Sequence, residues 1–187
     1  TDAIVLDVPD ADQVLKAGKN ALKLEITGNN TLPFTATWSY RTVQPVADAK
    51  AEVKMSTSLS RTKLSEGDTV DLKLHVENAS TKGQGMAVAI IGLPAGLTIP
   101  EDLKQLKQYC LPKTEGERPD VSYFEIRGRE LVLYWRDLAP QQKIDLNLSL
   151  IARVPGEYRG PASRSYLYYT PEHKDWVAPL SVEISPK

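Results

Sequence analysis

Apolar and polar residues alternate with a period of two along much of this chain. The clearest alternating runs are residues 22–26, 70–76 and 144–150. Alternation of this kind places one face of a strand in a core and the other in water, as is typical of antiparallel sheets. Shorter and more uniformly apolar runs predict strands that are buried more fully. These runs are residues 86–91, 121–126 and 131–135.

Glycine-containing turns separate these runs. They include Glu66-Gly67-Asp68, Lys82-Gly83 and Pro155-Gly156. Arg127-Gly128-Arg129-Glu130 joins two of the apolar runs and predicts a tight hairpin. Many short strands at this spacing are typical of a sandwich. We therefore expect a mainly β protein, built as an antiparallel β-sandwich.

One segment has a helical period instead. Leu103, Leu106 and Cys110 recur at i, i+3 and i+7 and form one apolar stripe. Pro100 suits a first helical turn, and the acidic residues that follow it suit the positive end of the helix dipole. The pattern predicts one short crossover helix at about 100–109, between strands of the sandwich.

A break in composition near residues 44–50 separates two β-rich stretches. Residues 1–46 predict about three strands, at 3–8, 21–27 and 33–40, and residues 50–187 predict the sandwich. Three strands bury too little apolar surface to offset the conformational entropy lost on folding. We expect the first stretch to pack on the second, or to belong to a domain whose remainder is not in this sequence.

Length and charge limit the classes of partner. The chain has 187 residues with 23 Lys+Arg against 24 Asp+Glu, which gives a net charge of −1. Because positive and negative charges are almost equal in number, the chain has no bulk electrostatic attraction to nucleic acid or an anionic membrane. No apolar run approaches the ~20 residues that cross a bilayer. The start at Thr1, without Met or a leader, suggests a mature product or an excised piece.

Reactive side chains are scarce. Cys110 is the single cysteine, and the two histidines, His75 and His173, lie far apart in sequence. We interpret Cys110 as a small core residue and His75 as a solvent-facing strand residue. No motif for nucleophilic catalysis, phosphate binding or metal binding appears. The sequence therefore predicts no enzyme, no catalytic residue, no cofactor and no metal.

A family resemblance rests on a diffuse pattern over residues 50–187. The segments that carry it are residues 85–97, with Gly92-Leu93-Pro94-Ala95-Gly96, and then residues 123–127, 131–136 and 166–170. In order and spacing they resemble the C-terminal, receptor-binding-type domain of alpha-2-macroglobulin-family proteins, in a bacterial form. The resemblance implies a β-sandwich with one crossover helix and a closing strand with a Tyr-Tyr pair, here Tyr168-Tyr169.

The same resemblance implies a role for the first stretch. Residues 16–24 and 32–40 resemble the second half of the CUB-like domain that precedes the C-terminal domain in this family. The chain would then be a C-terminal fragment of a larger extracytoplasmic protein, whether periplasmic, surface-bound or secreted. The family's Cys-x-Glu-Gln thioester motif is absent, because Leu111-Pro112-Lys113 follows Cys110.

The favoured function is a non-catalytic interaction domain of an alpha-2-macroglobulin-like protease inhibitor. The resemblance implies that it packs on and shields the thioester domain, moves on protease trapping, and meets proteases only through the parent protein. Candidate interaction residues are Lys104, Lys107, Tyr166, Tyr168 and Trp176. The two lysines lie on the helix that corresponds to the receptor-binding helix of animal relatives, although their spacing departs from that pattern. Two solvated lysines opposite the leucine stripe are the favoured interpretation.

Two other classes stay open. The aromatic residues from Tyr166 to Trp176 also suit a free-standing cell-surface adhesion or carbohydrate-binding sandwich, since aromatic faces are efficient contact surfaces. Cross-strand packing is the simpler interpretation of those tyrosines. An enzyme that uses Cys110 with a histidine is the least favoured class.

Overall fold

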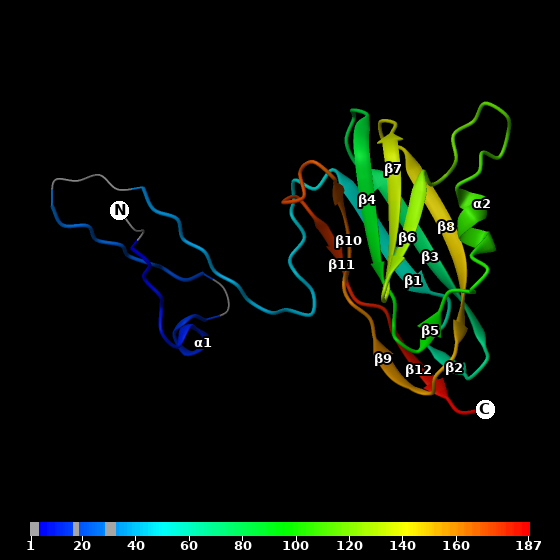
Figure 1. Ribbon diagram of the computed structural model, residues 1–187, viewed down its shortest axis with the longest axis horizontal. Helices are drawn as coiled ribbons and strands as arrows, with labels where there is room; N and C mark the ends of the chain where they lie inside the picture. Colours follow the sequence, from blue (N-terminus) through cyan, green and yellow to red (C-terminus); the bar gives the residue numbers. More distant parts are fainter. Residues whose placement is uncertain (1–3, 17–18, 29–32) are drawn as a thin grey trace. The chain divides into compact units, whose positions relative to one another are not determined.

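The computed structural model describes residues 4–16, 19–28 and 33–187. The chain divides into two units, Thr1–Ser39 and Tyr40–Lys187. The described strands all belong to the second unit (Figure 1). They are β1 Val53–Leu59, β2 Lys63–Ser65, β3 Thr69–Asn78, β4 Gln84–Gly92, β5 Leu97–Thr98, β6 Tyr123–Arg127, β7 Glu130–Leu138, β8 Lys143–Ala152, β9 Gly156–Arg159, β10 Ser163–Leu167, β11 Asp175–Val177 and β12 Ser181–Ser185.

Two large antiparallel sheets share one core. The first has the order β1-β3-β8-β5 and the second the order β11-β10-β4-β7-β6. Leu72 and Leu74 of β3, Leu131 and Leu133 of β7, and Leu148 of β8 belong to the same buried cluster. In β3 and β8 these residues alternate with polar ones, as the sequence predicted, whereas β7 contains the more uniformly apolar run at 131–135. The antiparallel sandwich is therefore confirmed.

The smallest sheet has the order β2-β12-β9 and departs from a purely antiparallel arrangement. Strand β12 pairs with β9 in antiparallel register but with β2 in parallel register. Two of its residues, Val182 and Ile184, are buried in the same core as the large sheets. Apolar and polar residues thus alternate in the C-terminal strand as they do in the longer strands, and its apolar residues contribute to the sandwich core.

The predicted hairpin between the apolar runs is confirmed. Strands β6 and β7 pair from Tyr123 opposite Tyr134 to Arg127 opposite Glu130. Gly128 in the connection has a φ of 59°, a backbone conformation that glycine adopts without steric cost. This register matters for function because it brings residues of both strands together on one sheet face.

The crossover helix is α2, and it is shorter than predicted. It spans Lys104–Tyr109, because Leu103 has a left-handed φ of 53° and cannot continue a helix backward. Asp102 Oδ1 accepts a hydrogen bond from the Lys104 amide at 3.1 Å, which satisfies one free N–H at the helix start. Leu106 is buried in the main core, as the helical stripe predicted.

Side chains of α2 take the place of a neighbouring strand beside β8. The Gln105 amide donates to the Ser149 carbonyl and accepts from the Ser149 N–H, both at 2.8 Å. The Tyr109 hydroxyl bonds both backbone groups of Asn147, at 3.0 and 3.1 Å. Edge backbone groups need partners of this kind if they are not to pair with another chain. The helix therefore caps a sheet edge.

The first unit differs from the prediction for residues 1–46. Its described residues form α1, Ala11–Val14, and no strand, although strands were expected at 3–8, 21–27 and 33–40. Residues 1–3, 17–18 and 29–32 of that expectation lie outside the described residues. The alternating side chains of Leu22, Leu24 and Ile26 are exposed. A strand needs a paired neighbour and a covering layer, and the described part of this unit supplies neither.

We predict that limited proteolysis separates the two units. A protease of broad specificity should cleave within residues 4–39, whose described residues are almost all exposed, and leave residues 40–187 as a resistant core. Mass spectrometry of the time course measures this. A stable, resistant fragment of residues 1–45 would contradict it.

We also predict that Asn78→Ala destabilises the sandwich by about 3 kcal/mol, because buried polar groups lose their partners. Asn78 is 1% exposed, and its amide donates to the carbonyls of Lys82 and Ala139 at 2.7 and 2.9 Å and accepts from Ser80 at 2.9 Å. Denaturant unfolding measures the change. The control Asn147→Ala removes an exposed side chain and should cost less than about 0.5 kcal/mol.

Candidate functional site

The five-stranded sheet is apolar on both of its faces. Inward residues of β4 and β7 join the main core, and a second buried cluster lies among their outward residues. This second cluster consists of Val88, Ile90 and Val132, with Tyr134 and Tyr166 packed against it. Val88 is only 1% exposed. Strands buried on both faces are typical of sheets that have layers on both sides.

A groove with a volume of about 620 Å³ runs over this outer face. It is lined by residues of β4, β6, β7 and β10 and of the segments next to them: Met86, Ile90, Ser122, Tyr123, Glu125, Arg127, Tyr134, Trp135, Arg136, Tyr166 and Tyr168. The Tyr123 and Tyr134 rings lie with centroids 6.1 Å apart. Tyrosine, arginine and methionine are the residues enriched in protein interfaces, and lysine is depleted there. The lining contains four tyrosines, two arginines and one methionine and no lysine, together with Ser122 and Glu125.

A polar triad forms one side of the groove. The Arg127 guanidinium donates two hydrogen bonds to the Glu125 carboxylate, at 2.8 and 2.9 Å, and the Tyr134 hydroxyl donates a third at 2.6 Å. Arg127, and then Tyr134, lower the pKa of Glu125. Burial, and then the bond to Glu125, raise the pKa of Tyr134 to about 12. The triad therefore holds the Tyr134 ring in place as a neutral phenol.

Two further tyrosines project just beyond the end of β10. Tyr168 and Tyr169 are 51% and 76% exposed, and their rings make an edge-to-face contact with centroids 5.3 Å apart. The Tyr168 amide donates to the Met86 carbonyl at 2.7 Å. Met86 has a φ of 52°, and neither Met86 nor Arg136 appears in the pairing of β4 with β7, although the register is the same on both sides of this local break. The Met86 carbonyl thus anchors Tyr168 just beyond the end of β10.

The structure brings together some of the residues predicted from the sequence. Tyr166 and Tyr168 line the same groove, as their alternation indicated, while Leu167 packs on the main core. Tyr169 follows the end of β10 and is exposed, so the alternation stops there. Lys104 and Lys107 lie on α2 and contact Asp102 through its carboxylate and carbonyl. Neither lysine is among the described residues that line the tyrosine groove.

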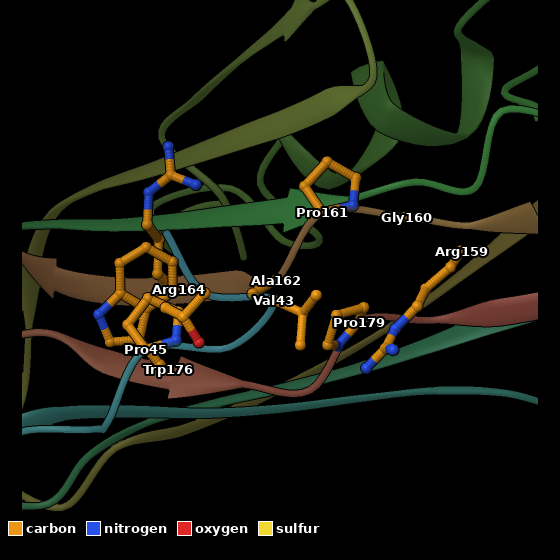
Figure 2. Close-up of a pocket in the computed structure, with 10 residues that line it drawn as sticks. Val43, Pro45, Arg159, Gly160, Pro161, Ala162, Arg164, Trp176 and Pro179 are labelled. Atoms are coloured by element: carbon orange, nitrogen blue, oxygen red, sulfur yellow. The ribbon is translucent and has the colours of Figure 1, made fainter. Parts of the chain in front are cut away.

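Trp176 belongs to a different hollow. It lies on β11 with the Arg164 guanidinium 5.4 Å from its ring centroid, and Arg164 also bonds Glu130 at 2.8 Å. Trp176 lines a cavity of about 390 Å³. Figure 2 shows it there together with Val43 and Pro45 of the segment that precedes β1. This preceding segment, residues 40–50, is called the linker below. Trp176 therefore contributes to the surface beside the linker rather than to the tyrosine groove.

Sequence reasoning missed Tyr123, Glu125, Arg127 and Tyr134 as site residues. The predicted hairpin contained the signal, because a two-residue turn after Arg127 fixes Tyr123 opposite Tyr134. The hydrogen bonds between these side chains depend on rotamers, which no periodicity specifies.

The reactive side chains considered earlier lie on different elements. His75 on β3 bonds Asp145, His173 in the β10–β11 turn bonds Asp48, and Cys110 ends α2. Burial raises the pKa of the Cys110 thiol, which disfavours the nucleophilic thiolate. Among the described residues, no group of three His, Cys, Asp or Glu side chains is placed to hold a metal ion. No described helix is long and apolar enough to span a bilayer.

The fold and the outer face together define a β-sandwich module whose outer face is partly apolar. Residues 40–172 match the bacterial alpha-2-macroglobulin MG10 domain. The chain therefore belongs to the bacterial alpha-2-macroglobulin family, as the resemblance in the sequence indicated. No curated protein matches the chain as a sequence relative.

Solved structures of macroglobulins share this fold. Trypsin-activated alpha-2-macroglobulin from Escherichia coli aligns with a TM-score of 0.58 and 19% identity, over 75% of this chain and 11% of that one. The native E. coli protein from domain MG7 to the C-terminus aligns with a TM-score of 0.57 and 17% identity, over 76% and 25%. Methylamine-reacted Salmonella alpha-2-macroglobulin aligns with a TM-score of 0.55 and 19% identity, over 75% of this chain and 10% of that one. The chain thus spans a quarter or less of each relative.

We predict that Tyr134 titrates with a pKa of about 12 and that Glu125→Gln moves this pKa toward the ordinary tyrosine value of about 10. Because the folded pKa is raised, the contribution of Tyr134 to stability is present below pH ~10 and is lost as the pH rises to about 12. Phenolate absorbance measures the titration, with Tyr134→Phe identifying the signal. An unchanged tyrosine titration in the Glu125→Gln variant would contradict the prediction.

Proposed function

We propose that residues 50–187 are the non-catalytic C-terminal interaction domain of an alpha-2-macroglobulin-like protease inhibitor. In this proposal the domain packs on the thioester domain of the parent protein through the outer face of its five-stranded sheet. The observation that supports it is the second apolar cluster, Val88, Ile90 and Val132, beneath the exposed tyrosine groove. A sheet face with an apolar centre, tyrosines and a polar border suits a protein partner.

The physical benefit of such a contact is the exclusion of water. A thioester is an electrophile that water hydrolyses, and a covering domain removes that competing nucleophile. Tyr168 and Tyr169 are both exposed and offer rigid aromatic surface with little rotamer entropy to lose. We propose that they supply the covering contact and that the domain moves away from it when a protease is trapped.

We further propose that residues 1–46 are the second half of a CUB-like domain. The exposed apolar side chains of the first unit support this, because they would be covered in a complete domain. They include Ile4, Leu6, Leu22, Phe34 and Trp38. Chains without enough apolar burial of their own need a partner to fold.

The remaining parts of the proposal concern the parent protein. Other macroglobulin domains of the parent would contact this one, proteases would meet it only through the parent, and the whole would act outside the cytoplasm. The family match and the short share of each relative that this chain spans support a multidomain parent. The domain itself contributes surface rather than a reactive group.

We predict that Tyr168→Ala in the intact parent accelerates spontaneous release of the thioester thiol. Loss of one interface hot spot worth about 1.4 kcal/mol corresponds to about a tenfold change. A thiol reagent measures the release over time in the native protein. Tyr168→Phe, which keeps the ring, should behave nearly as the wild type.

A matched control removes an exposed apolar side chain elsewhere. Leu111, which follows α2, is exposed, and Leu111→Ala should leave thiol release unchanged. Wild-type release rates in the Tyr168→Ala variant, with the domain still folded, would contradict the proposed contact.

A further inference from the structure

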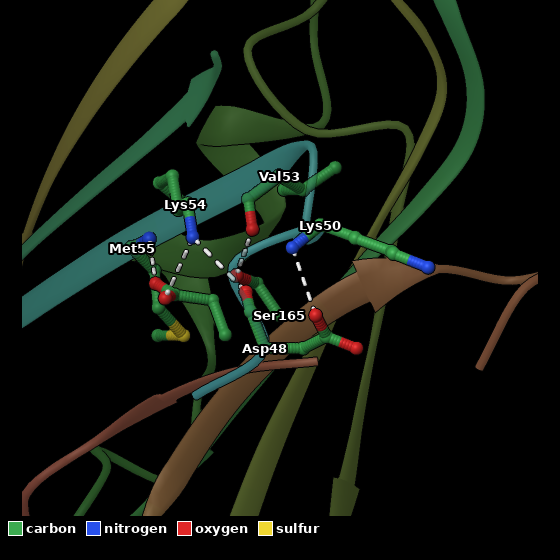
Figure 3. A network of polar contacts seen from close by, with 7 residues as sticks. Asp48, Lys50, Val53, Lys54, Met55 and Ser165 are labelled. Carbon is green, nitrogen blue, oxygen red and sulfur yellow. Dashed lines mark hydrogen bonds and ion pairs between the residues drawn. The ribbon is translucent and has the colours of Figure 1, made fainter. Parts of the chain in front are cut away.

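The linker is fastened to the turn between β10 and β11 by a single aspartate. Asp48 Oδ2 accepts a hydrogen bond from His173 Nδ1 at 2.8 Å, and the Asp48 amide donates to the Lys174 carbonyl at 2.8 Å. Asp48 Oδ1 accepts from the Lys50 amide, also at 2.8 Å (Figure 3). Asp48 therefore contacts the turn through both its side chain and its backbone. This set of contacts is called the Asp48 clasp below.

A second set of contacts joins β1 to Asp175, the first residue of β11, directly after the same turn. The Asp175 carboxylate accepts from the Met55 amide at 3.0 Å and from Lys54 Nζ at 3.4 Å. Lys54 Nζ also reaches the Asp48 carbonyl at 3.5 Å (Figure 3). Lys54 Nζ thus bridges the Asp175 carboxylate and the backbone carbonyl of Asp48. The linker, β1 and the end of the turn form one connected network.

The turn held by this network is the one that carries the exposed tyrosines. Tyr168 is anchored at its start through the Met86 carbonyl, and His173 N donates to the Thr170 carbonyl at 3.2 Å. The Lys174 ammonium lies 5.2 Å from the centroid of the Tyr166 ring, at the border of the groove. Residues 168–174 belong to no strand, so contacts of this kind determine their conformation. The clasp is therefore the anchor at the end of the turn opposite Tyr168.

We propose that Asp48 is a positioning residue that couples the linker to the tyrosine surface. By holding His173 and Lys174, it fixes the turn in the conformation that presents Tyr168 and Tyr169. A displacement of the linker then displaces the tyrosines, so a rearrangement of preceding domains in the parent would reach the covering contact through this route. The second half of this inference rests on the proposed function, whereas the clasp itself belongs to this chain.

The first experiment tests the clasp in this chain alone. Hydrogen exchange is measured for the wild type, Asp48→Ala, His173→Ala and the double variant. Each single change should accelerate exchange of the amides in residues 168–175 by about tenfold, and the double variant should not exceed the faster single variant. Exchange in β3 and β8 should stay unchanged, because their hydrogen bonds do not involve the turn.

The chain offers a closely matched control. His75 Nδ1 lies 2.7 Å from Asp145 Oδ1, so His75→Ala removes a histidine–aspartate pair of the same geometry on the other large sheet. It should leave exchange in residues 168–175 at the wild-type rate. If residues 168–175 of the Asp48→Ala variant exchange at the wild-type rate, the clasp is overturned, independently of any result with the parent protein.

The second experiment tests the coupling in the intact parent. Asp48→Ala should accelerate spontaneous thiol release about as much as Tyr168→Ala does, and it should add nothing in the Tyr168→Ala background. If Asp48→Ala only destabilised the domain, it would accelerate thiol release further in the Tyr168→Ala background. Acceleration by Tyr168→Ala without any by Asp48→Ala overturns the coupling and leaves the proposed contact standing. No acceleration by Tyr168→Ala overturns the proposed contact, and the exchange data then decide the clasp separately.

Discussion

The structure depends on the central strands of the five-stranded sheet being apolar on both faces. One face of β4 and β7 completes the sandwich core, and the other forms the cluster of Val88, Ile90 and Val132. Apolar side chains in the middle of an outer face must be covered, and here the tyrosines at 134 and 166 cover them in part. The same constraint that stabilises the fold therefore creates a surface suited to a partner.

The elements around this face serve to hold its tyrosines still. A two-residue hairpin sets β6 against β7, and the Glu125–Arg127–Tyr134 hydrogen bonds fix one ring. The Met86 carbonyl anchors Tyr168, and Asp48 holds the far end of the same turn. Rigid aromatic groups lose little entropy on binding, which makes such preorganisation worthwhile at an interface. Membership of the bacterial alpha-2-macroglobulin family places this surface in a multidomain context.

The features that the sequence predicted are those that depend on residues close together along the chain. The alternation at 70–76 and 144–150 identified β3 and β8, because their pattern and their pairing agree. The equally regular run at 22–26 forms no strand, since pairing requires a neighbour that the described residues of the first unit do not supply. The start of α2 was misplaced because the left-handed backbone of Leu103 leaves no periodic signal. The tyrosine pair was found by its density, but the Asp48 clasp joins residues 125 positions apart and could not be predicted from either end.

The central claim, that the outer sheet face contacts the thioester domain, is tested most directly by crosslinking. A photoreactive amino acid is placed at position 168 of the native parent, and the crosslinked peptides are identified by mass spectrometry. The account predicts crosslinks to the thioester domain in the native protein and their loss once a small primary amine has opened the thioester. Crosslinks to a different domain, or crosslinks that persist unchanged after the thioester opens, would contradict it.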